Sequence, residues 1–149
     1  MNFAGNIKLN NCNKTGFLCS RKIPSNIILK TYDWAIEQRD KGNCVVSGFH
    51  SKIEKDVFHY LLKGTQPIIL VLARCMYKKV PECLQKEMDK GRLLIISPFP
   101  DTVKRASERT TYLRNRYIIE ISDELYVPYA REGGQLERLL NTYPSKLKT

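Results

Sequence analysis

Short apolar runs alternate along this chain with amphipathic segments, an order typical of proteins with a parallel β-sheet. A strand buried on both faces lacks polar alternation, so the runs predict buried strands. The longest run is rich in Ile, Leu and Val and predicts a central strand. The five expected strands are Gly16–Cys19, Cys44–Val46, Pro67–Ala73, Leu93–Ile96 and Leu125–Tyr129.

Segments with apolar residues at helical spacing separate these runs and predict helices. In Ser51-Lys52-Ile53-Glu54, a serine is followed three residues later by a glutamate, which is the capping box that starts a helix. In the fourth helix we expect Leu113, Tyr117 and Ile121 to face the core. The expected helices are Asn26–Lys41, Ser51–Gly64, Pro81–Gly91, Thr111–Ser122 and Gln135–Asn141.

The alternation of strands and helices predicts a doubly wound, Rossmann-like α/β fold with a parallel sheet of about five strands. At 149 residues the chain is long enough for one domain with a substantial core. We place this core at about residues 14–141. The segments outside it, Met1–Lys14 and Thr142–Thr149, are expected to be short flexible ends, the second with a loose basic tail.

The charge balance favours a polyanionic partner, with nucleic acid as the first choice. Lys and Arg number 25 against 15 acidic residues, which gives a formal net charge of +10. A positive surface attracts polyanions through its summed field. The alternative is a basic surface that only keeps the protein soluble, because net charge concerns association and not fold.

The five cysteines have no close pairing, and no C-x-x-C sequence occurs. Cys19, Cys44 and Cys75 lie in or beside apolar runs and are expected to be small buried thiols. This usage suits a reducing, cytoplasmic location and argues against zinc. We find no signal peptide and no apolar run as long as a membrane span, and we expect no cofactor and no metal.

Candidate chemistry concentrates in the loops at the carboxyl ends of the expected strands, where open α/β sheets bind ligands. Three of these loops carry an arginine, and two carry a glycine that lets backbone approach a ligand. The triplet Arg114-Asn115-Arg116 is expected to open the fourth helix, where free N–H groups and guanidiniums would together bind phosphate. The loops are Ser20–Lys22, Ser47–His50, Arg74–Met76, Ser97–Pro100 and Arg131–Gly134.

Five short motifs occur in an order and spacing that resemble a known family. They are Cys19-Ser20-Arg21, Val45-Val46-Ser47-Gly48-Phe49, Ser97-Pro98-Phe99-Pro100, Arg114-Asn115-Arg116 and Gly134-Gln135-Leu136. From about Lys14 to Leu140 the chain resembles the Rossmann-like domain of the DNA-processing protein A (DprA/Smf) family. The wider superfamily includes the LOG cytokinin-activating enzymes.

This resemblance implies a module that binds single-stranded DNA, helps to load a recombinase and self-associates as a homodimer. It implies no catalytic residue. With loop residues added from the topology argument, the candidate binding set is Ser20, Arg21, Ser47, Gly48, His50, Ser97, Arg114, Asn115, Arg116, Gly133 and Gly134.

The chain departs from the family pattern at several positions. Cys19 replaces the first-loop glycine, and Pro98 replaces a glutamate. The segment His50–Glu54 replaces Ala-Arg-Gly-Ile-Asp and loses its arginine and its glycine. We interpret the chain as a diverged, single-domain member without the flanking domains of longer members.

Three functions remain open. The first is a non-enzymatic module that binds single-stranded DNA or nucleotide phosphates. The second is a small-nucleotide sensor that uses the same pocket. The third is a LOG-like nucleoside monophosphate phosphoribohydrolase, which Glu132–Leu140 disfavours because Leu140 stands where that family has its catalytic glutamate.

Several side chains have two open interpretations. Arg114 could bind ligand, or it could pair with Glu54 or Asp123. Two sets of residues could either contact nucleic acid or have only a structural or solvated role. The aromatic and imidazole side chains that could stack on bases are Phe49, His50, Tyr112 and Tyr129. For Phe49 and Tyr129 the alternative is a contact in the core or between subunits. The cations that could form a polymer track or remain merely solvated are Lys52, Lys55, Lys78, Lys79, Lys104 and Arg105.

Overall fold

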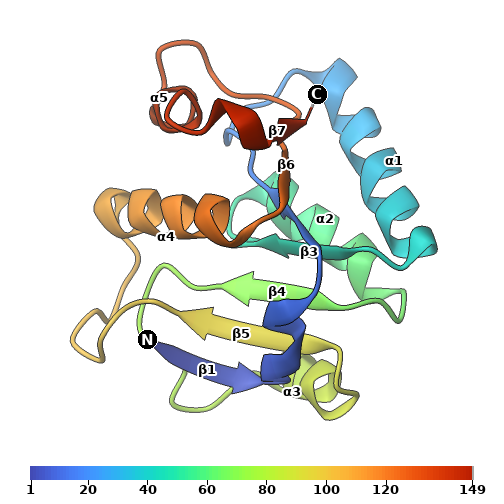
Figure 1. Ribbon diagram of the computed structural model, residues 1–149, viewed down its shortest axis with the longest axis vertical. Helices are drawn as coiled ribbons and strands as arrows, with labels where there is room; N and C mark the ends of the chain where they lie inside the picture. Colours follow the sequence, from blue (N-terminus) through green and yellow to red (C-terminus); the bar gives the residue numbers. More distant parts are fainter. Residues whose placement is uncertain (149) are drawn as a thin grey trace.

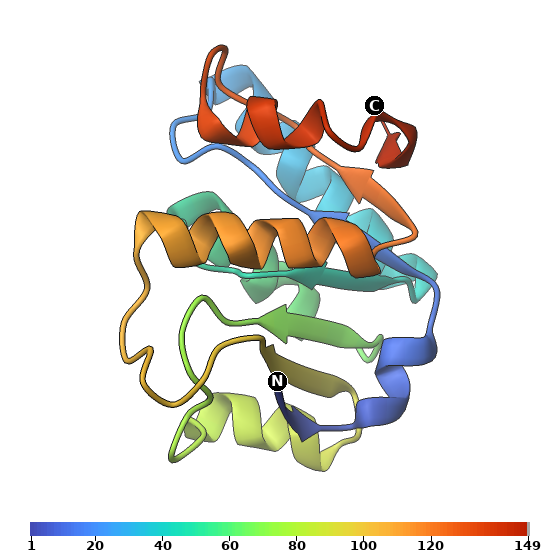
Figure 2. The same cartoon turned by 60° about the vertical axis from the view of Figure 1, so that its left-hand side comes forward.

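The computed structural model describes residues 1–148 and has three layers, with a β-sheet between two layers of helices (Figures 1 and 2). The strand order in the described sheet is β1-β5-β4-β3-β2-β6-β7. β1 is antiparallel to β5, and all other neighbours are parallel. The strands are β1 (Asn2–Gly5), β2 (Lys14–Phe17), β3 (Cys44–Ser47), β4 (Ile68–Val71), β5 (Leu93–Ser97), β6 (Glu124–Tyr126) and β7 (Leu147–Lys148).

Helices cover both faces of the sheet, so the doubly wound α/β prediction is confirmed. The α-helices are α1 (Ser25–Lys41), α2 (Lys52–Leu62), α3 (Glu82–Asp89), α4 (Glu108–Ile121) and α5 (Gln135–Leu140). Two 3-10 helices, η1 (Ile7–Asn11) and η2 (Pro144–Lys146), lie near the ends. Apolar residues of α1, α2 and α3 pack on one face, and those of α4, α5 and η1 pack on the other.

The central strands divide their side chains between these two cores. In β4, Ile68 and Leu70 belong to the core under α1 to α3, whereas Ile69 and Val71 belong to the core under α4. All four are buried. The predicted central strand without polar alternation is therefore confirmed, because each face of β4 lies under a helical layer.

Two signals in the sequence begin and end helices as predicted. The capping box of Ser51 and Glu54 starts α2, and Ile53, Val57 and Leu61 are buried on the inner face of this helix. Gly42 ends α1 with a φ of 77°, a left-handed conformation that glycine adopts without a steric penalty.

Both ends of the chain differ from the sequence prediction. Instead of being loose, Asn2–Gly5 pairs with β5, and Leu147–Lys148 pairs with β6. Lys146 is anchored, since its Nζ donates to the carbonyls of Ile119 (2.9 Å) and Glu120 (3.1 Å). Such short edge strands lack an apolar run, so periodicity could not identify them. The last residue of the predicted flexible end, Thr149, lies outside the described residues.

Helix α4 also requires a correction. It begins at Glu108, after a capping box of Ser107 and Thr110, so Arg114 lies well inside the helix and does not open it. The buried residues of α4 are Thr110, Arg114, Ile118 and Ile119, whereas the expected inward residues Leu113, Tyr117 and Ile121 are only half-buried. The inward stripe contains a threonine and an arginine, and apolar periodicity does not detect such a stripe.

An aromatic stack fixes α1 against the two strands β2 and β6. The ring of Trp34 lies 4.2 Å from that of Tyr126, at an interplanar angle of 11°. The Trp34 ring also lies 5.3 Å from the ring of Phe17. Trp34 is the only tryptophan of the chain. Stacking of aromatic rings adds to the free energy gained by burying them.

A buried ion pair joins α3 to Arg92, the residue that precedes β5. The Arg92 guanidinium donates to the Glu87 carboxylate, and also to the carbonyls of Gln66 and Leu61, both at 2.9 Å. Burial by itself raises the pKa of Glu87, but hydrogen bonds from Arg92 and Lys90 outweigh it and lower the pKa below its usual value. The ionised carboxylate therefore stabilises the fold.

This ion pair predicts a specific loss of stability in acid. Because the folded-state pKa of Glu87 is lowered, its contribution is present above the unfolded pKa of about 4.3 and is lost as the pH falls through the folded pKa. Urea unfolding at a series of pH values should show that the free energy of unfolding falls less in acid for Glu87→Gln than for the unmodified chain. Glu82→Gln, an exposed change on the same helix, is the control. Equal pH dependence in all three proteins would contradict the assignment.

No helix within residues 1–148 is long and apolar enough to cross a membrane.

Candidate nucleic-acid interface

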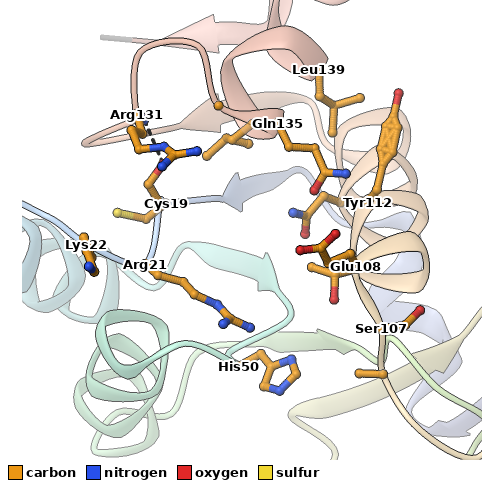
Figure 3. A pocket seen from close by; sticks show the side chains of 16 residues that line it. Cys19, Arg21, Lys22, His50, Ser107, Glu108, Tyr112, Arg131, Gln135 and Leu139 are labelled. Atoms are coloured by element: carbon orange, nitrogen blue, oxygen red, sulfur yellow. Dashed lines mark hydrogen bonds between the residues drawn. The ribbon is translucent and has the colours of Figure 1, made fainter.

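The topology opens a crevice at the carboxyl ends of β2 and β6. β2 leads to α1 on one face of the sheet, whereas its neighbour β6 leads to α5 on the other face. Loops that diverge in this way leave room between them, and open α/β sheets bind ligands at such a switch point. A first cavity of about 710 Å³ lies there (Figure 3).

The first cavity is lined mainly by polar and cationic side chains. Arg21, Lys22 and Arg131 line it from the β2–α1 and β6–α5 loops, and Glu108 is its lining carboxylate among the described residues. In Figure 3, Arg21 points across the cavity towards His50, while Glu108 faces it from the α4 side. The first turn of α4 also lines the cavity, and its dipole favours an anion there.

Hydrogen bonds join the two loops that carry these arginines. The backbone N–H of Ser20 donates to the carbonyl of Tyr129 (3.0 Å), and the backbone N–H of Arg131 donates to Oγ of Ser20 (2.8 Å). The Ser20 hydroxyl therefore connects the β2–α1 loop to the β6–α5 loop. This link holds Arg21 and Arg131 on one rim of the cavity.

A second cavity of about 550 Å³ adjoins the first, and His50 and Ala106 line both. No Asp or Glu among the described residues lines the second cavity. Its cations come from α2, the β4–α3 loop, the β5–α4 loop and α4. They are Lys55, Arg74, Lys104, Arg105 and Arg114.

Arg114 is a buried cation without a carboxylate partner. Arg114 is 3% exposed. Its guanidinium donates to Oδ1 of Asn115 (2.9 Å) and to the carbonyl of Val71 (3.4 Å). Within residues 1–148, no carboxylate oxygen lies within 4 Å of it. Burial lowers the pKa of Arg114, and the charge of Glu54 partly opposes this.

The expected alternative ion pairs of Arg114 do not form. The Glu54 carboxylate accepts from the backbone N–H groups of His50 and Ser51, both at 3.0 Å. The Asp123 carboxylate accepts from the backbone N–H of Lys14 (2.8 Å). Backbone donors occupy both carboxylates, and Arg114 forms no ion pair with either of them at the carboxyl edge of the sheet.

Gly48 allows the guanidinium of Arg114 to reach this position. A Cβ at Gly48 would lie 2.1 Å from Nη1 and 2.3 Å from Cζ of Arg114, which is far inside van der Waals contact. The glycine of the Ser47-Gly48-Phe49 motif is therefore required by packing of Arg114 against the backbone. This role needs no ligand.

The core interpretation of Phe49 is confirmed, and the residue also lines the second cavity. Phe49 is 6% exposed and its ring stacks on that of Phe58 at 4.5 Å. Its φ of 46° is unusual for a residue with a side chain, and turns the ring into the core under α2. Tyr112 lines the first cavity, whereas Tyr129 is half-buried and packs against the core.

Two predicted binding serines are fully buried. The hydroxyl of Ser47 accepts from the backbone N–H of Phe49 (3.2 Å). The hydroxyl of Ser97 donates to the carbonyl of Arg74 (2.6 Å). Both hydroxyls shape the loops that follow β3 and β5.

The predicted binding set divides into three groups. Ser20, Arg21, His50, Asn115 and Gly134 line the first cavity. Gly48, His50 and Arg114 line the second. Ser47, Ser97, Arg116 and Gly133 line neither, and exposed Arg116 faces Glu120 at 3.7 Å.

Several lining residues were not in the predicted binding set, although Lys22 and Arg74 lie in loops that the sequence had selected. Lys22 and Glu108 belong to the first cavity, and Arg74 to the second. Of the cations proposed as a track, Lys55, Lys104 and Arg105 line the second cavity, whereas Lys52, Lys78 and Lys79 line neither. Lys22 and Arg74 come just after predicted strands, which was the available signal, whereas Glu108 is the first residue of α4 and carried no such signal. Which cavity each side chain lines depends on how the loops close.

The imidazole of His50 lies where the two cavities meet. Partial burial, followed by the positive charge of Arg114, lowers the pKa of His50 below its usual value. The neutral ring can then accept or donate a hydrogen bond at neutral pH. Among residues 1–148, no three Cys, His, Asp or Glu side chains converge in a group that could hold a metal ion.

Comparison with known proteins gives a consistent result. Residues 1–138 match the DNA recombination-mediator protein A family. DNA processing protein A of Helicobacter pylori, whose structure concerns its single-stranded DNA binding mode, superimposes with a TM-score of 0.76 at 21% identity. The alignment covers 97% of this chain and 68% of that one.

DNA processing protein A of Streptococcus pneumoniae has a TM-score of 0.71 at 19% identity. That alignment covers 93% of this chain and half of that one, so this chain spans only part of the longer protein. No curated protein sequence matches the chain significantly. Because the family match extends over most of its length, the chain belongs to the DNA recombination-mediator protein A family.

Proposed function

We propose that the chain binds single-stranded DNA along the carboxyl edge of its sheet and does not catalyse a reaction. The observation that supports this best is the charge of the two adjoining cavities, which are lined by eight cationic side chains and one carboxylate among the described residues. Lysine and arginine bind a polymer by neutralising phosphates and releasing counterions. A half-buried aromatic side chain in the first cavity, Tyr112, offers a face for one base.

The side chains of the site that could act as acid or base disfavour a phosphoribohydrolase. Leu140, at the position of the LOG glutamate, is apolar and 7% exposed. Glu108 lines the first cavity, and no second carboxylate of the described residues lines either cavity. Membership of the family supports two further parts of the proposal, self-association as a homodimer and delivery of the bound strand to a recombinase.

A salt series tests the proposal. Fluorescence anisotropy with a labelled single-stranded oligonucleotide should show binding at low salt, with log K falling linearly against log salt at about −0.7 per contacted phosphate. If three to five cations contact phosphates, the slope should be about −2 to −3.5. Absence of binding at low salt would contradict the proposal.

A further inference from the structure

The second cavity has a chemistry that a phosphate polymer alone does not require. Its walls include Phe58, Leu72, Tyr77 and Leu84, together with the buried ring of Phe49. Three exposed cations, Lys55, Lys104 and Arg105, lie among the residues that line it. The cavity therefore combines an apolar interior with a positive rim.

Arg114 adds a buried positive charge to this apolar interior. Its hydrogen bonds with described residues engage Nε and Nη1, and no carboxylate oxygen of residues 1–148 lies within 4 Å of it. The charge of Glu54 acts on it only from a greater distance. A buried charge is costly unless it is paired, and a guanidinium pairs best with a phosphate or carboxylate group through two parallel hydrogen bonds. An anion entering the cavity would supply the missing partner.

The same cavity offers surfaces suited to a flat ring. The guanidinium of Arg74 lies over the ring of Tyr77 at 5.5 Å from its centroid, and both line the cavity. Planar aromatic and guanidinium groups stack on a third flat group at little entropic cost. The volume of about 550 Å³ is within the range of small-molecule sites.

We propose that the second cavity is a separate binding site for a small anion that carries a flat apolar ring, of the mononucleotide class. Its phosphate pairs with the cations of the cavity, including Arg114, and its base packs against the apolar walls. The cations of the first cavity, Arg21, Lys22 and Arg131, remain available to the polymer, whereas those of the second serve the polymer only while the nucleotide is absent. The same ring-and-phosphate chemistry could instead come from one base of a bound strand, and the experiment distinguishes these two sources.

Cys83 provides a direct reporter of occupancy. It is exposed and lines the second cavity, whereas half-buried Cys12 lines neither cavity and serves as an internal control. The alkylation rates of both thiols by iodoacetamide can be followed by peptide mass spectrometry. Adenosine monophosphate should slow alkylation of Cys83 at least threefold and leave Cys12 unchanged. Inorganic phosphate and adenosine, each at the same concentration, should protect less than the nucleotide.

Variants of the exposed β5–α4 loop test whether the nucleotide binds in the second cavity. Lys104→Glu combined with Arg105→Glu should abolish protection of Cys83, whereas Lys41→Glu, in the last turn of α1 and outside both cavities, should retain it. No protection by adenosine monophosphate at millimolar concentration would overturn the proposal. Protection by inorganic phosphate equal to that by the nucleotide would also overturn it, because the ring would then contribute nothing.

An oligonucleotide identifies the source of the ring. If nucleotide protects Cys83 while a labelled single-stranded oligonucleotide stays bound by anisotropy, the two sites are separate, as proposed. If the oligonucleotide itself protects Cys83 and the nucleotide displaces it, the cavity holds a base of the bound strand and the separate site is refuted. Failure of the oligonucleotide to bind at all would refute the proposed function alone, since nucleotide protection is measured without it.

Discussion

Gly48→Ala is expected to destabilise the protein by about 3 kcal/mol, at the upper end of typical overpacking costs. The new Cβ would lie 2.1 Å from Nη1 of Arg114, so the guanidinium must leave its place. Displacement breaks the hydrogen bond to the carbonyl of Val71 and disturbs the junction of β3, β4 and α4. Urea unfolding followed by circular dichroism measures the change in the free energy of unfolding.

A double-mutant cycle shows whether Arg114 causes this loss. In the Arg114→Ala background the guanidinium is absent and the alanine methyl group has room, so Gly48→Ala should cost much less. We expect a coupling free energy of about 1 to 3 kcal/mol between the two positions. Additive effects would mean that the glycine is required for a reason other than contact with Arg114.

The combined change Arg21→Glu and Arg131→Glu should weaken binding of single-stranded DNA by about a hundredfold at low salt. This estimate assigns roughly tenfold, or about 1.4 kcal/mol, to each lost phosphate contact. The salt slope should fall in magnitude by about 1.4, because two contacts each release about 0.7 counterion. Anisotropy titrations of the variant and the unmodified chain measure both quantities.

A matched control separates local contact from net charge. Lys41→Glu combined with Lys8→Glu changes the net charge by the same amount, but both lysines are exposed, in the last turn of α1 and in η1, away from the carboxyl edge of the sheet. The ion pair of Lys41 with Glu37 is solvated on both sides and stabilises little, and neither Lys41 nor Lys8 lines a cavity. If this control loses as much affinity as the arginine variant, binding depends on overall charge and not on the first cavity.

Five strands of the sheet could be predicted from apolar runs because β2 to β6 lie between helices. β1 and β7 could not. Asn2–Gly5 is a short edge strand with one half-buried side chain, so its pairing with β5 leaves no pattern in the sequence. Edge strands are fixed by backbone hydrogen bonds to a neighbour, and those depend on the completed sheet.

The position of Arg114 illustrates a different limit. The start of α4 at Ser107 has a threonine at the third helical position, where a capping box usually has Glu or Gln. The weaker signal placed the helix start too late and Arg114 too near it. The rule that ligands bind beyond the carboxyl ends of strands nevertheless selected the loops of Arg21 and Arg131, since it depends on topology and not on exact helix bounds.

The division of the carboxyl edge into two cavities was beyond sequence reasoning. Lys55, Arg74 and Lys104 come from three separate elements, and only the way the loops close brings them around one volume. The sequence indicates that a cation follows a strand. It does not indicate which of two neighbouring cavities the side chain will line.

The stack of Trp34 on Tyr126 and Phe17 gives the protein a built-in optical probe. As the only tryptophan, Trp34 dominates emission when the indole is excited selectively, and its quantum yield depends on contact with β6 and β2. Loss of the stack exposes the indole to water, which shifts the emission to longer wavelength. Unfolding of the edge that frames the first cavity can therefore be followed without any attached dye, in the same sample used for the binding titrations.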